Sequence, residues 1–484
     1  MSKANFTYHQ TTGPALRRSA RCAGIGWLWT AVVVAAPVPI VQAGVEDGEP
    51  VYVVVKAARV ITATGDMFEP GEVVIEDGKI SLVGSSLEYP GSATVIEAPG
   101  RTVMPGLVLA RSRFGLPRYT RRGVHGDQNV ADEVFLGLQS FDEFVQAGYT
   151  TVCFYPAGQG IPGLACAYKT AGPADQRRLG PNAYLEVAAA FNSSAKGKAL
   201  LRNALKKAKD EIEKVEKARK EWEEKQKKAK EESEKKKDSE KPEKEKKDKN
   251  GKAARHRGRG RAHHGNGDEP EKKEAANGKE PEKAEVFEPP PIDPKHQPLV
   301  DLIQEKEGAR MMVRLARASD WLHLDDVLEP YDDLAHSLYL TRWGRTTDFH
   351  HVIKQLGQRK VQIVIKPFVY RLPYTATRYN LMRELARAGC ELSTVPVRDS
   401  RRELLAARRR LAEVVRAGLE REQAIGSLTL HPARVIGLEE RLGSLEKGKD
   451  ADLVFLDADP LDPHSTVVGV MIEGKMVWEA QDSQ

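Results

Sequence analysis

The sequence lacks the short motifs that mark several large enzyme classes. Its 12 histidines form no H-x-H pair and no H-E-x-x-H motif, so the common zinc-hydrolase patterns are absent. It contains no P-loop and no G-x-S-x-G elbow. The glycine pairs at 158–160 and 258–260 lack the flanking strand and helix that a dinucleotide-binding site requires. No catalytic template can therefore be assigned from a local motif.

Cysteine is also scarce, with four residues in 484. Cys22 lies in an N-terminal apolar segment, which leaves Cys153, Cys166 and Cys390 in the rest of the chain. An odd number of cysteines in an exported protein argues against a disulfide framework. Buried free thiols are therefore expected, with one bridge as the alternative. Cys153 lies in a strand-like run and is predicted to be a core residue.

Long apolar runs are absent outside the first 43 residues. Cys22–Ile40 is mostly apolar, follows three arginines and precedes Val41-Gln42-Ala43, which fits the small-x-small cleavage rule. Residues 1–43 are therefore predicted to be a secretory signal, and the mature chain is expected in the periplasm or outside the cell. The alternative is an uncleaved membrane anchor, since the apolar run is just long enough to span a bilayer.

Charge of both signs is abundant. The chain carries 75 Lys and Arg against 69 Asp and Glu, a formal net charge of +6, and 40% hydrophobic residues supply a substantial core. A low-complexity insert, residues 206–290, holds much of this charge. Leu200–Lys237 is predicted to form a solvated helix of coiled-coil composition, with disorder beyond it. The insert also contains a short basic tract with Arg255, Arg257, Arg259 and Arg261.

A β-rich segment precedes the middle of the chain, and a second follows it. Within residues 44–104 the run Gly71–Gly84 is typical of a hairpin whose turn, Asp77-Gly78, has the preferred composition for type I′. This unit of about 60 residues is too small to be stable by itself. Its partner is expected in residues 441–484, which contain further strand-like runs.

Strands and helices alternate between these two segments, which predicts parallel βα units. The spans 105–205 and 291–440 together hold about 250 residues, the size of one (β/α)₈ barrel. A long, Arg-rich amphipathic helix is predicted at Arg401–Gly418. The strands expected here include Tyr149–Tyr155, Ala309–Leu315, Val361–Ile365 and Glu391–Val397.

Two segments carry a family resemblance. Val103–Leu116, VMPGLVLARSRFGL, resembles the strand that opens the catalytic barrel of the amidohydrolase superfamily, whose pattern is P-G-L-[IV]-D-x-H-x-H. Leu428–Pro460 resembles that superfamily's T-x-N-P-A…G-K-x-A-D-L-V region, with His431 in place of asparagine. The chain is most similar to the imidazolonepropionase-like branch. The resemblance implies an α/β fold, a TIM-like (β/α)₈ barrel with a composite β-sandwich built from residues 44–104 and 441–484.

The same resemblance implies a metal centre that this chain does not keep. The two histidines that hold a divalent metal in the family are replaced by Arg111 and Arg113, and the preceding acidic position by Leu109. Guanidinium is always charged and has no lone pair to give a cation. We therefore expect no cofactor, although the family would use zinc or another divalent metal to activate water.

The later ligand positions are also altered. Two histidines normally end strands five and six, and their positions fall near Arg314 or Leu315 and near Arg342 or Trp343. The family's last barrel strand ends in an aspartate that serves as metal ligand and general base, and Asp399 stands about there. The alternative role for Asp399 is an N-cap of the following helix.

The leading hypothesis is an exported amidohydrolase-like protein that is catalytically impaired and acts as a binding protein or pseudoenzyme. Arg111, Arg113 and Arg314 are predicted to bind a small anionic molecule or to neutralise nearby carboxylates. One alternative is an active hydrolase of carbon–nitrogen bonds other than peptide bonds, for example in cyclic amides. Another is weak polyanion binding through the basic tract. The sequence is compatible with an oligomer.

Overall fold

The computed structural model describes residues 7–8, 50–117, 120–137, 140–188, 194–239, 286–331, 334–341 and 346–481. Most of the predicted signal, the basic tract and the positions 342 and 343 lie outside these described residues. None of the described helices is long and apolar enough to cross a membrane. The chain divides into two compact units, 1–207 with 294–484 and 208–293.

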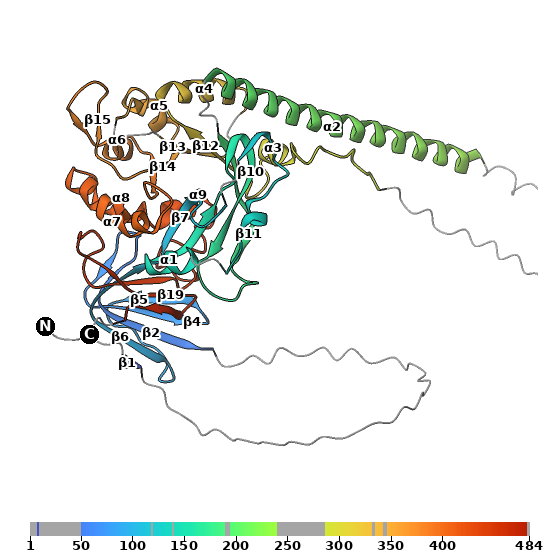
Figure 1. Ribbon diagram of the computed structural model, residues 1–484. Coiled ribbons are helices and arrows are strands. Elements are labelled where there is room, and N and C mark those ends of the chain that lie inside the picture. Colours follow the sequence, from blue (N-terminus) through green and yellow to red (C-terminus); the bar gives the residue numbers. More distant parts are fainter. Residues whose placement is uncertain are drawn as a thin grey trace, which may run out of the picture. The chain divides into compact units, whose positions relative to one another are not determined.

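A nine-stranded sheet joins segments from the two ends of the chain (Figure 1). β6 (Thr94–Pro105) and β18 (Leu453–Leu456) pair antiparallel at its centre, with Pro105 opposite Leu453. The predicted type I′ turn is present, because Asp77 and Gly78 both have positive φ, +48° and +78°. The remaining strands are β1 (Thr7–Tyr8), β2 (Tyr52–Ile61), β3 (Met67–Phe68), β4 (Gly71–Glu76), β5 (Lys79–Gly84), β19 (Val467–Ile472) and β20 (Lys475–Glu479).

This composite sheet curls until β5 reaches the loop before β18. Ile80 N donates to Lys449 O at 2.9 Å, and Ala451 N donates to Gly78 O at 2.8 Å. The curl encloses one apolar core to which both ends of the chain contribute. β-Branched and aromatic side chains dominate that core because alternate positions of each strand face the same side. Its fully buried members include Val55, Val73, Ile75, Leu453 and Phe455.

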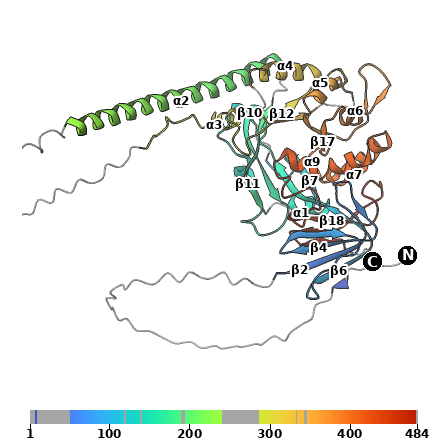
Figure 2. The same ribbon diagram turned by 180° about the vertical axis from the view of Figure 1, so that it is seen from behind.

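The second large sheet is a nearly closed barrel of eight strands, which lies above the composite sheet in Figure 1 and Figure 2. Leu428 and Ser427 bridge the gap between its first and last strands. Val108 N donates to Leu428 O at 2.9 Å, and Thr394 N donates to Ser427 O at 2.8 Å. In spatial order the strands are β7 (Leu107–Ser112), β9 (Tyr149–Phe154), β10 (Gly158–Lys169), β11 (Arg178–Ala188), β12 (Met311–Leu315), β13 (His336–Leu340), β14 (Gln362–Ile365) and β17 (Glu391–Thr394).

One strand departs from the predicted parallel βα pattern. β10 runs antiparallel to both β9 and β11, whereas the other neighbours in the barrel are parallel. Glycines permit this strand, because the backbone of β8 (Arg121–Val124) lies against it. A Cβ added at Gly160, where φ is +92°, would lie 2.4 Å from Gly123 O. Gly158, Gly160 and Gly163 therefore lie inside a strand.

Helices cover the barrel sheet, and one of them is the Arg-rich helix that the sequence predicts at Arg401–Gly418. The Arg-rich helix is α7 (Arg401–Arg416). Two short strands, β15 (Tyr370–Arg371) and β16 (Arg378–Tyr379), form a hairpin after β14. The other helices here are α1 (Ser140–Gln146), α3 (Gln297–Ile303), α4 (Ala318–Leu328), α5 (Ile353–Gln358), α6 (Leu381–Arg387), α8 (Arg421–Gly426) and α9 (Leu430–Val435), with 3-10 turns η1 (Val130–Glu133) and η2 (Phe349–His351).

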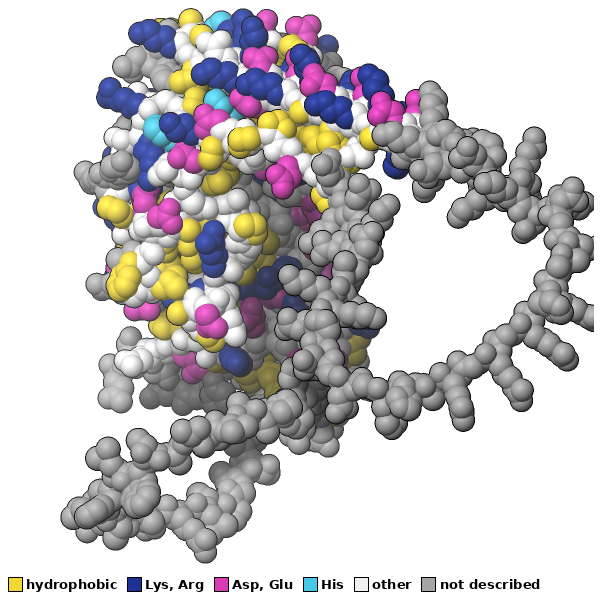
Figure 3. Space-filling view, turned by 90° about the vertical axis from the view of Figure 1, so that its right-hand side faces the viewer, with side chains coloured by type: hydrophobic (Ala, Val, Ile, Leu, Met, Phe, Trp, Pro, Cys, Tyr) yellow, Lys and Arg dark blue, Asp and Glu magenta, His cyan; other side chains and the backbone are white. Residues whose placement is uncertain are grey.

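The predicted charged helix is α2 (Ser194–Ser239), which begins before the predicted start at Leu200. Leu201 and Leu205 are buried, so this part of the helix is packed against the protein and is not solvated as predicted. Within the second unit, the rings of Trp222 and Phe287 lie 5.7 Å apart. On the face shown in Figure 3, basic and acidic side chains are interspersed rather than gathered by sign.

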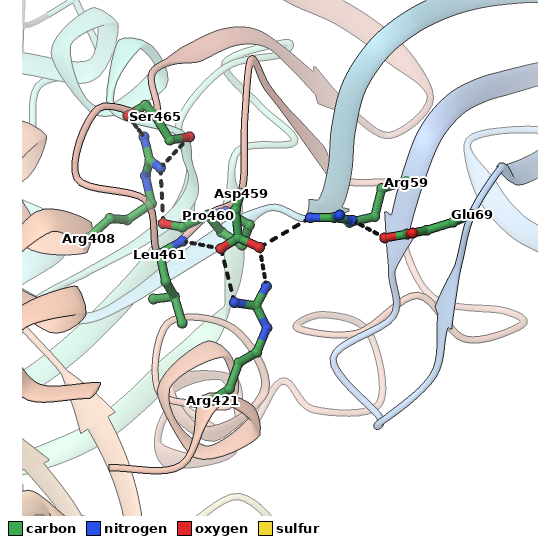
Figure 4. Close-up of polar contacts among 8 residues, drawn as sticks. All are labelled: Arg59, Glu69, Arg408, Arg421, Asp459, Pro460, Leu461 and Ser465. Carbon is green, nitrogen blue, oxygen red and sulfur yellow. Dashed lines mark hydrogen bonds and ion pairs between the residues drawn. The ribbon is translucent and has the colours of Figure 1, made fainter. Parts of the chain in front are cut away.

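An arginine–aspartate network links the composite sheet to the barrel helices (Figure 4). Asp459 accepts hydrogen bonds from both terminal nitrogens of Arg421 on α8, at 3.0 and 2.6 Å. It also pairs with Arg59 on β2 at 3.2 Å. Burial raises the pKa of Asp459, but hydrogen bonds from Arg421 and from Leu461 N outweigh it and lower the pKa below its ordinary value.

Replacing Asp459 with asparagine is expected to lower the free energy of unfolding by about 1–2 kcal/mol, because three charge-assisted hydrogen bonds weaken. A carboxyl with a depressed pKa stabilises the fold above its ordinary pKa of 3.8 and loses that contribution as the pH falls further. The difference in the free energy of unfolding between the variant and the wild type should therefore become smaller below about pH 3.8. Urea unfolding at several pH values measures both effects. Glu422→Gln, at an exposed position of the same helix, is the control.

Candidate functional site

The barrel site lies at the end of β7, where the family pattern places its metal-binding pair. Arg111 is the next-to-last residue of this strand. Its side chain points into the barrel interior and is 6% exposed. Its Nη2 donates to Glu186 Oε1 of β11 at 2.7 Å, and the glutamate side chain is 1% exposed. The two positions are 75 residues apart in the sequence. A buried ion pair therefore occupies the interior beside β7.

Two tyrosine rings enclose the Arg111 guanidinium. Its central carbon lies 3.3 Å from the centroid of the Tyr155 ring and 4.2 Å from that of Tyr339 on β13. Cation–π attraction of this kind strengthens when water is excluded. Burial lowers the pKa of Arg111, but attraction to Glu186 outweighs it and raises the pKa well above the ordinary value. The guanidinium therefore stays charged inside the barrel.

The pair is incompletely satisfied. Arg111 Nε and Glu186 Oε2 are both buried, and neither has a hydrogen-bond partner among the described residues. A buried polar atom without a partner costs about 1–3 kcal/mol, so such atoms usually mark a bound water, ion or ligand. The interior therefore offers one donor and one acceptor that the protein itself does not use.

Arg113 has a different environment from Arg111. It lies one residue beyond β7, after an irregularity in the pairing between β7 and β9. Its Nη2 pairs with Glu133 Oε2 at 2.9 Å, and its Nη1 donates to Tyr155 O at 2.7 Å. Arg113 therefore helps to fix the loops at the rim of the barrel.

In the described contacts Asp399 does not pair with the guanidinium of Arg111 or of Arg113. Its Oδ1 accepts from Ser112 Oγ and from the backbone N of Arg113, each at 3.2 Å. The N-cap residue of α7 is Ser400, which makes no side-chain capping bond. Asp399 thus ties the loop after β17 to the end of β7, and Glu186 and Glu133 neutralise the arginines instead.

Arg314, the third predicted anion-binding residue, lies on β12. Its Nη2 donates to Gly158 O at 3.1 Å, and its Nε is buried without a hydrogen-bond partner in the described part of the chain. No described contact joins it to Arg111 or Arg113. The equivalent position after β13, at residues 342 and 343, lies outside the described residues.

The residues present do not fit a divalent metal. In the described ranges, no three side chains of His, Cys, Asp or Glu gather as a metal site. The place where the family pattern puts imidazole holds a guanidinium, which repels a cation. His350 and His351 stack on each other, with ring centroids 3.9 Å apart. His431 Nδ1 contacts Leu392 O at 2.9 Å, in keeping with its predicted packing role.

The cysteines offer no nucleophile. Cys153, Cys166 and Cys390 are free and buried, as predicted. Burial raises the pKa of the Cys153 thiol well above its ordinary value and that of Cys390 to about 11. Since the thiolate is the reactive form, these residues belong to the apolar interior.

Sequence reasoning missed Glu186 and its two tyrosine neighbours. One signal was available, since Glu186 is the single charged residue in the run Ala183–Ala188. A charge within an apolar strand needs a partner when that strand is buried. The sequence does not show which residue supplies the opposite charge.

Comparison with known proteins agrees with this architecture. Residues 392–477 match the model of the amidohydrolase family. An amidohydrolase of known structure from Thermotoga maritima MSB8 superimposes with a TM-score of 0.66 at 20% identity, over 88% of this chain and 100% of that one. By the match over residues 392–477 and by its overall fold, the chain is similar to amidohydrolases.

The similar curated enzymes match over short segments. N-acetylglucosamine-6-phosphate deacetylase of Bos taurus is 40% identical over 67 residues, which is 14% of this chain and 15% of that enzyme. The 5-methylthioadenosine/S-adenosylhomocysteine deaminase of Teredinibacter turnerae is 46% identical over 46 residues, 10% of each chain. The chain therefore spans about 15% of the length of the first curated relatives it matches.

Proposed function

We propose that this chain is a non-hydrolytic amidohydrolase-like protein whose barrel interior binds a small polar molecule. The observation that carries the proposal is the buried Arg111–Glu186 pair. It stands where a hydrolase of this family would hold a metal, and it leaves Arg111 Nε and Glu186 Oε2 without partners. A ligand that accepts a hydrogen bond from Nε and donates one to Oε2 would satisfy both atoms.

The net charge of the barrel site indicates whether its ligand is neutral or charged. Arg111 is neutralised by Glu186 in the barrel interior, whereas Glu133 at the rim is shared by Arg113 and Arg121, at 2.9 and 2.7 Å, so the excess positive charge lies at the rim and not at the interior pair. A neutral amide carries the required acceptor and donor side by side. We therefore favour a small amide over a simple anion for the barrel interior.

The second candidate is an active hydrolase of carbon–nitrogen bonds other than peptide bonds. The names of the similar curated enzymes, a deacetylase and a deaminase, favour it. It requires either a metal held by residues other than those described or a metal-free reaction.

Binding and turnover can be separated in one experiment. The purified protein, supplied with Zn²⁺ or Mn²⁺ and then desalted, is expected to retain less than about 0.1 metal ion per chain by elemental analysis. The cyclic amide 2-pyrrolidone should raise the thermal midpoint of the wild type but not of Glu186→Gln, and no 4-aminobutyrate should form. About one metal per chain, together with turnover, would establish the hydrolase instead. If 2-pyrrolidone raises the thermal midpoint of neither the wild type nor Glu186→Gln, amide binding is excluded.

Export is a separate part of the proposal and is supported by residues 1–43. We propose cleavage after Ala43, which would release the chain from the membrane. Cell fractionation and N-terminal sequencing of the recovered protein test this. A protein that starts at Met1 and sediments with membranes would indicate an anchor instead.

A further inference from the structure

A hollow of about 540 Å³ lies beside the β15–β16 hairpin and shares no lining residue with the barrel site. It is formed where the loop after β14, the start of α6 and the end of α7 come together (Figure 1). Its lining is unusually rich in arginine and includes Phe368, Arg371, Arg378, Arg383, Glu413 and Arg416.

The hairpin places two like charges directly opposite each other. Arg371 and Arg378 are cross-strand partners in the β15–β16 pair. Like charges at directly opposed positions destabilise a β pair, and a hairpin with two residues in each strand is marginal by itself. An anion held between the two guanidinium groups would convert this repulsion into attraction.

The structure supplies little negative charge to offset these arginines. The side chains of Arg371, Arg378 and Arg416 have neither an ion pair nor a side-chain hydrogen bond with any described residue. Arg383 is the exception, because its Nη2 pairs with Glu384 at 2.6 Å. Even with Glu413 in the wall, the lining keeps an excess of positive charge.

Hydrogen bonds hold one part of the lining, around Asn380, in place. Asn380 is 4% exposed, and its Nδ2 donates to Val414 O at 2.9 Å and to Ala417 O at 3.1 Å. These bonds tie the start of α6 to the last turn of α7, which carries Arg416. On the opposite side, the Phe368 ring packs edge-on against Tyr370, with centroids 6.0 Å apart. The arginines therefore project from a supported frame.

We propose that this hollow is a binding site for a small ligand that carries a doubly charged phosphate group. Guanidinium groups present planar forks that match phosphate oxygens, and two such groups on directly opposed residues, Arg371 and Arg378, favour a doubly charged anion over a singly charged one. The Phe368 wall provides apolar contact for the uncharged part of such a ligand. This site is additional to the amide site proposed in the barrel interior and does not depend on it.

Titration of the purified full-length chain with inorganic phosphate and with glycerol 2-phosphate, at constant ionic strength, tests the proposal. Calorimetry should show saturable binding of both, and Arg378→Gln should weaken it at least about tenfold, since charge-assisted hydrogen bonds are lost. Arg378→Lys should give an intermediate affinity because it keeps the charge but not the fork. Arg402→Gln, an equal loss of charge at the exposed start of α7, should leave binding unchanged.

Two results would overturn the proposal. One is equal affinity in the wild type, Arg378→Gln and Arg416→Gln, which would place phosphate elsewhere. The other is a response to phosphate no larger than the response to chloride at the same ionic strength, which would indicate general screening of surface charge. Circular dichroism of each variant establishes that its fold is intact before it is titrated.

Discussion

Replacing Glu186 with glutamine is expected to lower the free energy of unfolding by about 3–5 kcal/mol, because it leaves the Arg111 guanidinium charged and unpaired in the barrel interior. The pair is 2.7 Å long, and both side chains are almost fully buried. The contacts of the Arg111 guanidinium with the rings of Tyr155 and Tyr339 cannot replace the lost carboxylate, since cation–π contacts contribute about 0.5–2 kcal/mol. Urea unfolding followed by circular dichroism measures the change.

A surface ion pair serves as the control, because it shows how much stability is lost when a pair that is not buried is broken. Asp325→Asn breaks a surface pair with Arg359, whose side chain is 56% exposed, and should cost about 0–1 kcal/mol. Replacing both members of the interior pair, as Arg111→Met with Glu186→Leu, should cost less than Glu186→Gln alone, because no unpaired charge remains. If Glu186→Gln costs no more than the surface control, the interior pair is solvated and the description of the site is wrong.

The second large effect is expected for Lys169→Met. Lys169 on β10 is 2% exposed, and its Nζ lies 2.7 Å from Asp452 Oδ2 and 3.0 Å from Asp450 Oδ2. This lysine joins the barrel to the composite sheet at their common boundary. Its removal leaves two carboxylates without their shared cation and should cost about 3–5 kcal/mol. Lys79→Met is the control, because Lys79 also pairs with Asp450 but is 48% exposed.

The same variants should differ in their acid sensitivity. Burial raises the pKa of Asp450, but attraction to Lys169, aided by hydrogen bonds from Lys79 and Lys169, outweighs it and lowers the pKa to about 2. The stabilising contribution of Asp450 is therefore present above pH 3.8 and is lost as the pH falls from 3.8 towards 2. In Lys169→Met the pKa of Asp450 should rise, so acid unfolding should begin at a higher pH. An unchanged acid transition in Lys169→Met would contradict this account of Asp450.

The packing of the described fold does not require a metal centre. The core of the composite sheet and the strands of the barrel are held by apolar side chains, none of which depends on a ligand. The fold therefore does not decide the chemistry, which depends on the residues at the barrel mouth.

Local pattern was sufficient for the elements whose sequence signal is local. The hairpin around Asp77-Gly78, the helix Arg401–Arg416 and the charged helix from Ser194 to Ser239 follow from turn chemistry and from helical periodicity. Local pattern did not predict β10, a strand that contains Gly160 and Gly163. Their role depends on β8, a strand whose backbone passes close to them and whose position the local sequence does not specify.

By itself the sequence showed that Arg111 and Arg113 stand where the family resemblance would place the histidines of a metal pair. It also determined that buried arginines would need carboxylate partners, since unpaired charge is costly in an interior. Only the tertiary structure decided which carboxylates these are. Closure of the barrel brings β7 and β11 together across 75 residues of sequence and selects Glu186 for Arg111, while Asp399 is turned toward the backbone at the end of β7.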